Sequence, residues 1–114
     1  MELIGPHEGK EFDLIRKGQK DVALFYELIP QEYFEFKRLD QYGVIEFEKP
    51  VAMDDIAGSV LYVILYRRGF QDEAEELRNL VESKTKGFNL TSERRIGEIL
   101  GYPEEAIEHY LHSL

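Results

Sequence analysis

The sequence predicts an α+β domain: a small antiparallel sheet of about three strands, covered on one face by an N-terminal helix and three C-terminal helices. Two observations predict this class. Short runs rich in β-branched and aromatic residues occupy the first two thirds of the chain, whereas residues 70–114 place apolar side chains three or four positions apart. Strands followed by a run of helices are typical of α+β folds. The 114 residues suffice for one core, so we assign residues 1–114 to a single domain.

The first helix and the first strand are predicted from local signals near the N-terminus. Pro6 suits the first helical position because its φ is already fixed near the helical value, and Gly18 ends the helix. Phe12 and Ile15 form the apolar side of this helix. The run Val22–Tyr26 is mostly apolar, as in a strand that is buried on both faces. We therefore expect it to be the central strand of the sheet.

A short helix and an edge strand are predicted next. Residues 30–36 are expected to form one or two helical turns that lie over the sheet. After Gly43, Ile45 and Phe47 alternate along the chain with Val44, Glu46 and Glu48. This alternation indicates an edge strand with one face in water.

The most apolar segment, residues 60–66, is predicted to be a third strand. Five of its seven residues are Val, Ile or Tyr, which favour strands. Periodicity does not separate a buried strand from a buried helix here. A helix from Asp54 to Arg68, with Asp54 as its N-cap, therefore stays open as the alternative.

Three helices are predicted to follow the strands. The first runs from Asp72 to about Lys84, with apolar residues spaced by three and four positions. The second begins at Thr91 or Ser92 and ends at Gly101, and the third begins at Pro103. Together they give the helical layer of the predicted fold.

The composition excludes several classes of chemistry. The chain has no cysteine, which excludes a disulfide framework, a thiolate nucleophile and cysteine-bound metal. No signal peptide and no apolar run of about 18 residues is found, so we expect a cytoplasmic protein that does not enter a membrane. The formal charge of −9 repels phosphate backbones, so direct nucleic-acid or anionic-membrane binding would need a concealed basic patch.

The densest polar cluster is the segment Gly5–Glu11. In a helix, His7 and Glu11 would lie one turn apart, a spacing that lets a carboxylate orient an imidazole or lets both side chains contact one metal ion. Acidic residues are also expected near a helix start because of the helix dipole, so a purely structural role is the alternative. The segment is not a phosphate-binding loop, and no serine-hydrolase elbow is found elsewhere.

Two further clusters are weaker candidates. His109 and His112 lie three positions apart near the C-terminus, but a metal site needs a third or fourth rigid ligand, so we expect no metal and no cofactor. Basic residues could meet as an anion site, with ordinary solvated side chains as the alternative. These residues are Arg67, Arg68, Lys84, Lys86, Arg94 and Arg95. A helix-turn-helix is disfavoured because the helix after Pro103 begins with acidic residues.

The two ends of the chain carry a family resemblance. The opening Gly5-Pro6-His7-Glu8-Gly9-Lys10-Glu11 and the closing Ile99-Leu100-Gly101-Tyr102 resemble those of a family of short uncharacterised bacterial proteins, as do the runs 23–25 and 62–66 between them. The resemblance spans most of the chain. It implies a bacterial source and makes the His7–Glu8 end a family feature, and it brings no assigned activity.

The function that these observations favour is binding of a protein partner, as a small regulator, immunity-type protein or inhibitor. The prediction depends on the absence of a convincing nucleophile, metal set or phosphate loop. The candidate binding surface joins the first helix start to the turn before the last helix, through His7, Glu8, Glu11 and Tyr102. The apolar stripe of the last helix offers a homodimer contact instead, through Tyr110, Leu111 and Leu114.

Two other functions stay open. A small-molecule enzyme or binding protein could use His7 with Glu8 or Glu11 as an acid–base pair in a concave pocket. An acidic mimic of nucleic acid would place most of the 23 acidic residues on one face, and the basic residues interspersed among them count against it.

Overall fold

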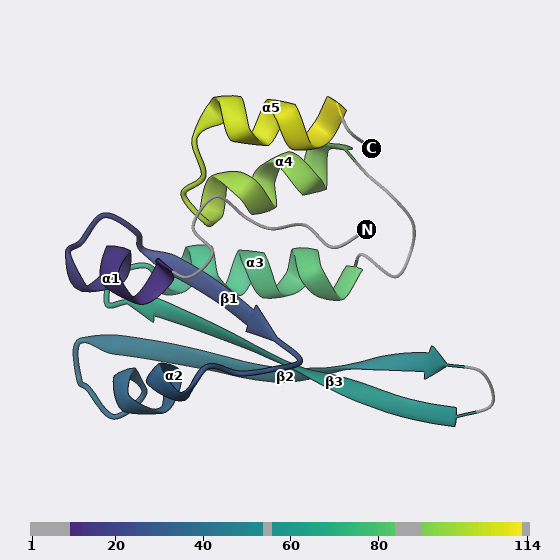
Figure 1. The fold of residues 1–114 in the computed structure, drawn as a ribbon, viewed down its shortest axis with the longest axis horizontal. Helices are drawn as coiled ribbons and strands as arrows, with labels where there is room; N and C mark the ends of the chain where they lie inside the picture. Colours follow the sequence, from purple (N-terminus) through teal and green to yellow (C-terminus); the bar gives the residue numbers. More distant parts are fainter. Residues whose placement is uncertain (1–9, 54–55, 84–89, 113–114) are drawn as a thin grey trace.

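The predicted α+β class is confirmed in the computed structural model, which describes residues 10–53, 56–83 and 90–112 (Figure 1). The elements follow in the order α1 (Glu11–Arg16), β1 (Val22–Tyr26), α2 (Gln31–Phe36), β2 (Tyr42–Met53), β3 (Ile56–Arg67), α3 (Gln71–Ser83), α4 (Leu90–Ile99) and α5 (Glu104–His112). The three strands form an antiparallel sheet in the order β1-β3-β2.

The central strand is β3, so the prediction that Val22–Tyr26 is central was wrong. β3 pairs with β2 along its whole length, from Ile56 opposite Met53 to Arg67 opposite Tyr42. It pairs with β1 only over residues 62–66. β1 is an edge strand that is buried on both faces by helices, and an apolar run does not distinguish this case from a strand with two neighbours. The alternative prediction of a helix from Asp54 to Arg68 is excluded over Ile56–Arg67, which form the strand β3.

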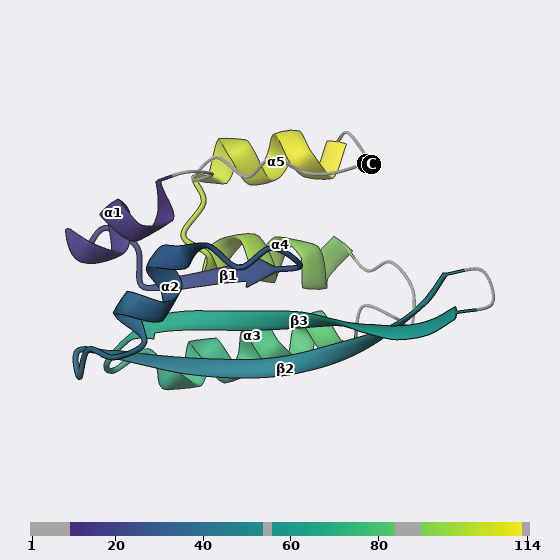
Figure 2. The ribbon, with the colours of Figure 1, turned by 60° about the horizontal axis from the view of Figure 1, so that its bottom comes forward.

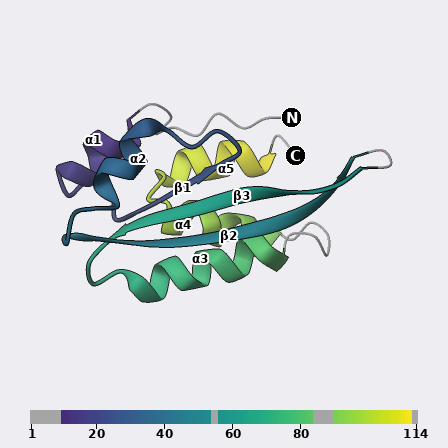
Figure 3. The same ribbon diagram turned by 90° about the horizontal axis from the view of Figure 1, so that it is seen from below.

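Helices lie on both faces of the sheet, so the prediction of a single covered face was also wrong. Figure 3 shows α3 on one side of the sheet and α1 with α2 on the other. Strand side chains alternate between two separate cores. The α3–α4 side holds Val22, Phe47, Ile64, Ala74, Leu77, Val81, Ile96, Ile99 and Leu100. The α1–α2 side holds Phe12, Ile15, Ala23, Phe25, Tyr33, Phe36, Val63 and Leu65.

Two glycines fix local geometry at the covered end of the sheet. Gly18 ends α1 with a φ of 75°, as predicted, and its N–H donates to the carbonyl of Ile15. Gly43 lies within β2, opposite Tyr66, and a Cβ at this position would come within 2.3 Å of the Tyr66 ring. The predicted helix start at Pro6 lies outside the described residues, in which α1 begins at Glu11.

The β2–β3 hairpin continues beyond the end of β1. Figure 2 shows both strands extending past β1, and in Figure 1 they also extend past α3. We call this part the arm and define it as residues 49–53 of β2 and 56–60 of β3, which pair with each other in regular register. Lys49, at the base of the arm, still donates to the carbonyl of Val81 in α3 at 2.9 Å. Beyond Lys49 the arm extends past the helices and keeps its strand pairing.

Candidate functional site

Among the described residues, one edge of β3 has no partner strand in the arm. β1 ends at Tyr26, and Glu27, with a φ of 67°, turns the chain away after its N–H donates to the carbonyl of Leu61 at 3.3 Å. Beyond this bond, none of the described residues pairs with the β1 side of β3. Every second residue of an antiparallel strand turns its N–H and C=O to the same side. The groups that face the open side are therefore those of Ala57 and Ser59.

Exposed apolar side chains flank this open edge. Leu28 is 90% exposed, and Tyr26 and Leu61 are 43% and 40% exposed. The Tyr26 ring stacks on that of Tyr62, with the centroids 5.1 Å apart, which places it on the α3–α4 side. Leu61 precedes Tyr62 in the strand, so it points to the opposite side. Apolar surface therefore lies on both sides of the edge.

Charged side chains of both signs lie near this edge. Exposed Glu27 follows β1, whereas Glu48 and Lys49 belong to β2, on the other side of β3, and the Lys49 ammonium lies 6.0 Å from the ring centroid of Tyr62. Burial raises the pKa of Tyr62, and the neighbouring Tyr26 and Glu27 raise it further, so the phenol stays neutral at physiological pH. We call this region the edge surface: the open side of β3 over residues 56–60 with Tyr26, Leu28 and Leu61.

The structure brings part of the sequence-predicted surface together through Lys20. The Lys20 ammonium donates to the carbonyl of Leu100 and lies 5.0 Å from the ring centroid of Tyr102. Desolvation lowers the pKa of Lys20 to about 8, against the opposing charges of Glu11 and Asp21. Lys20 thus links the start of β1 to the α4–α5 turn. His7 and Glu8 lie outside the described residues.

Sequence reasoning missed Lys20. A single lysine between Gln19 and Asp21, in a polar segment, carries no signal of burial, yet Lys20 is only 2% exposed. Its burial follows from the packing of the α4–α5 turn against the start of β1.

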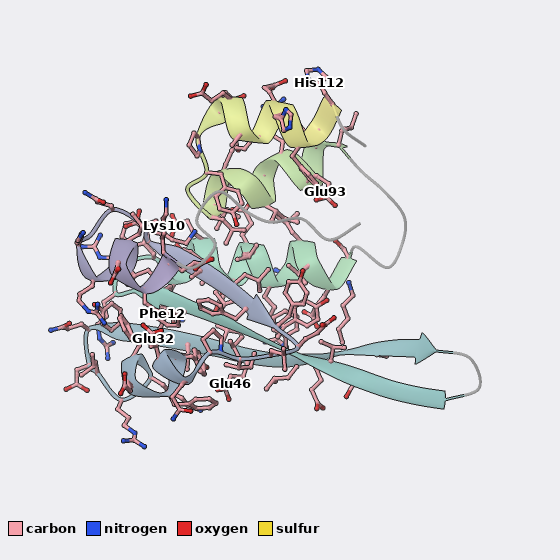
Figure 4. The ribbon with its side chains drawn as sticks, in the orientation of Figure 1. Lys10, Phe12, Glu32, Glu46, Glu93 and His112 are labelled. Atoms are coloured by element: carbon pink, nitrogen blue, oxygen red, sulfur yellow. The ribbon has the colours of Figure 1, made fainter. Side chains whose placement is uncertain are left out.

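The other candidate residues are separated or paired within the chain. His109 and His112 are exposed on α5, and Figure 4 shows His112 on its outer side. Within the described ranges, no group of three His, Cys, Asp or Glu side chains could hold a metal ion. The hydroxyl of Tyr110 donates to Glu93 at 3.4 Å, so this residue of the predicted dimer stripe contacts α4. Of the other two stripe residues, Leu111 is half-buried and Leu114 lies outside the described residues.

The two arginine pairs do not share one anion site. Arg95 forms two hydrogen bonds with Glu76 of α3, at 2.7 and 2.8 Å, and Arg94 bonds Glu104 and Glu108 of α5. Arg67 bonds Asp21 at 2.8 Å instead. Lys84 and Lys86 lie outside the described residues. Arg94 and Arg95 therefore join the three C-terminal helices.

A buried tyrosine anchors α2 to the sheet. The hydroxyl of Tyr33 donates to Glu46 at 2.6 Å, and Lys37 donates to the same oxygen at 2.8 Å. The bonds from Lys37 and Tyr33 hold the pKa of Glu46 below its usual value, and burial is the main cause that raises the pKa of Tyr33. Figure 4 shows Glu46 beside α2. The Tyr33 side chain is fully buried, so this cluster is structural.

Comparisons with known proteins add a fold relationship. No family model matches the chain, and no curated protein matches it. Among solved structures, the chain is similar to the bacterial cysteine methyltransferase effector NleE, with a TM-score of 0.57 and 17% identity over 99% of this chain and 65% of that chain. This chain thus spans just under two thirds of the length of NleE. At this identity the likeness shows the fold alone.

No helix in the described ranges is long and apolar enough to cross a membrane.

Proposed function

We propose that this protein binds a partner protein by adding an extended segment of the partner to the open edge of β3. One observation carries this proposal: β1 pairs with only five residues of the 12-residue β3 and leaves the edge of the arm without a partner among the described residues. In strand addition, backbone hydrogen bonds supply affinity, and contacts to alternate side chains supply specificity.

The two outer edges of the hairpin support the choice of β3. Its open segment 56–60 reads Ile-Ala-Gly-Ser-Val, which has no charge and no proline. The outer edge of β2 carries Glu46, Glu48 and Pro50. Pro50 lies opposite Ser59, a position from which its nitrogen faces away from β3, so that edge lacks a donor there. Charges and proline are how proteins protect edges from pairing, and only the β2 edge has them.

The chemistry of the edge surface indicates the partner segment. Exposed Tyr26, Leu28 and Leu61 favour a strand with apolar side chains. Exposed Glu27 at the start of the open edge, together with a formal charge of −9, favours Lys or Arg between these apolar side chains. The like charge of a second copy disfavours self-pairing. We therefore expect an extended segment that alternates apolar and basic residues.

A peptide-display selection with a matched pair of variants tests the proposal. Ser59→Pro removes the N–H that faces the open edge, a substitution that edge strands tolerate, whereas Ser59→Thr keeps this donor. We expect wild type and Ser59→Thr to select apolar–basic peptides and Ser59→Pro to bind them at least about tenfold more weakly, the effect of losing roughly one hydrogen bond. Equal binding by all three proteins would overturn the proposal.

A second variant pair covers the case in which proline distorts the arm. Leu28→Lys places a positive charge on a side chain that is already 90% exposed, and Leu90→Lys does the same at a 55% exposed leucine at the start of α4. We expect only Leu28→Lys to weaken binding of the basic peptides. Sedimentation of the free protein tests the competing occupant: self-association that Ser59→Pro abolishes would identify a second copy and contradict a separate partner.

Methyl transfer is the second candidate function, and the fold likeness to a cysteine methyltransferase effector favours it. In this case the small-molecule enzyme considered from the sequence would be a methyltransferase, with His7 and Glu8 or Glu11 as the candidate acid–base pair. Calorimetry with S-adenosylmethionine, the general biological methyl donor, tests this candidate in wild type and in His7→Ala. Binding that His7→Ala abolishes would support it, and absence of binding at millimolar concentration would remove it.

A further inference from the structure

A basic pocket lies at the opposite end of the hairpin from the arm. Its volume is about 470 Å³, and four cationic side chains line it: Arg16, Lys17, Arg67 and Arg68. Among the residues that the structure describes, no carboxylate lines it, although Asp13 and Asp21 pair with two of these cations from outside the lining. Figure 4 shows nitrogen-bearing side chains gathered beside α1, next to the ends of β2 and β3. With Asp13 and Asp21 counted, the pocket still has two more cations than carboxylates, in a chain with nine more acidic than basic residues.

The backbone brings the two pairs of cations together. Gly18 reverses the chain after Arg16 and Lys17, and a Cβ on Gly18 would lie 3.7 Å from the guanidinium carbon of Arg67. The N–H of Arg68 donates to the carbonyl of Gln41 at 3.1 Å, which fixes the start of β2 beside the end of β3. The pocket is therefore built from three separate segments of the chain.

Arg67 and Arg16 are held in place by interactions that leave donors free. Arg67 donates through one terminal nitrogen to Asp21 at 2.8 Å, and its guanidinium lies 5.9 Å from the ring centroid of Phe70. Arg16 likewise bonds Asp13 at 3.0 Å. A guanidinium has five N–H donors in a planar fork, so one such bond orients the group and leaves other donors for an anion.

The remaining cations are less constrained. Arg68 donates through Nε to the carbonyl of Asp40, which leaves its terminal nitrogens for a ligand. Lys17 is exposed and forms no ion pair with any residue in the described ranges. Half-buried Tyr42 and the amide of Gln41 complete the lining and offer contacts to an uncharged part of a ligand.

We propose that this pocket binds a small phosphorylated compound that carries at least two adjacent phosphate groups. Arginine forks bind phosphate oxygens bidentately, and three forks that each bind two oxygens would use up to six, more than a single phosphate group presents. The volume lies within the range of small-molecule sites, about 300–1,000 Å³. The formal charge of −9 repels a long polyanion such as nucleic acid, whereas a small anion contacts only the pocket. This site is independent of the edge surface.

Calorimetry with inorganic triphosphate tests the proposal on the whole chain. We expect binding with a stoichiometry near one that weakens as salt is added, because the contacts are ionic. Arg68→Gln and Lys17→Gln should each weaken binding by about fivefold to tenfold, the loss expected for one charge-assisted contact. Lys17 is exposed and unpaired in the described ranges, so Lys17→Gln keeps the test valid if an arginine variant fails to fold.

Arg78→Gln is the matched control. Arg78 also pairs with a carboxylate, Glu82 at 3.1 Å, and lies 5.4 Å from the ring centroid of Phe47, but it belongs to α3, away from the pocket. The Arg78→Gln substitution changes the net charge by the same amount as Arg68→Gln and Lys17→Gln, and it should leave triphosphate binding unchanged. An equal loss in Arg78→Gln, no binding at low salt, or tighter binding of a single-stranded oligonucleotide than of triphosphate would overturn the proposal.

Amide NMR gives a second readout of the location. Addition of triphosphate should shift the backbone signals of Gly18 and Tyr42, which line the pocket, and leave that of Gly58 in the arm unchanged. Shifts confined to the arm would contradict the assignment of the site.

Discussion

The two ends of the β2–β3 hairpin differ in cover and in charge. At the end where Tyr42 faces Arg67, helices pack on both faces of the sheet and four cations line a pocket. At the arm, none of the described residues pairs with the outer edge of β3, and exposed Glu27 lies where this open edge begins. The cause is a difference in strand length, since β1 has five residues and β3 has 12. The length of one edge strand thus decides which part of the sheet is core and which part is available for binding.

The largest expected effect compares two leucines of β3. Leu65 is fully buried against the α1–α2 core, whereas Leu61 is 40% exposed beside the arm. We expect Leu65→Ala to lower the free energy of unfolding by about 3 kcal/mol and Leu61→Ala by less than about 1 kcal/mol. Urea denaturation measures both. Equal losses would show that the arm end is as tightly packed as the covered end.

A smaller effect compares two glycines of the same hairpin. A Cβ on Gly43 would overlap the Tyr66 ring, at 2.3–2.5 Å, whereas nothing lies within 4 Å of a Cβ on Gly58. We expect Gly43→Ala to destabilise the protein by about 2 kcal/mol through overpacking and Gly58→Ala to change stability by less than about 0.5 kcal/mol. Thermal unfolding of the two variants checks this order, and a harmless Gly43→Ala would contradict the close packing of Tyr66.

The pH dependence of stability tests Lys20 at the covered end. Its pKa is about 8 in the folded chain and near the ordinary 10.5 in the unfolded chain, so the unfolded state binds more protons between these values. The free energy of unfolding should therefore rise with pH, by about 1–2 kcal/mol between roughly pH 8 and 9.5, a window in which most tyrosines, with an ordinary pKa of about 10, stay protonated. In Lys20→Met this rise should disappear. A rise of the same size in the variant would assign the titration to another group.

The smallest expected effect concerns the ion pair that joins α3 to α4 above the sheet. Arg95 bonds both oxygens of Glu76, and this contact lowers the pKa of Glu76. Both side chains are about 40% exposed, so we expect Arg95→Gln to lower stability by only about 0.5–1 kcal/mol. Urea denaturation at low and high salt checks the value. A loss above about 2 kcal/mol would indicate that Arg95 supports more than this pair.

Much of the fold could be predicted from the sequence because local signals agree with the final packing. Gly18 ends α1, the Val and Tyr content of β3 favours a strand, and helical spacing marks α3. The strand order could not be predicted. The mostly apolar run Val22–Tyr26 is compatible with a central strand and with an edge strand under two helical layers, and only the pairing with β3 separates them.

The candidate sites were harder to predict from the sequence than the fold. The pocket combines residues 16–17 with 67–68, and no periodicity links segments that far apart. The open edge of β3 arises because β1 ends at Tyr26 and the next residue, Glu27, has a positive φ. A glutamate gives no sequence signal for such a backbone conformation. The uncharged stretch 56–60 was a usable signal, since an edge strand without charge or proline is unusual.

Amide hydrogen exchange at Ser59 tests the open edge of β3, on which the proposed function depends. In the free protein, we expect Ser59 to exchange rapidly, whereas the amide of Val63, whose residue lies between β1 and β2, exchanges slowly. Addition of a selected apolar–basic peptide should protect Ser59 and leave Val63 unchanged. If Ser59 is already as protected as Val63 in the free monomer, the edge is closed and the proposed binding mode is contradicted.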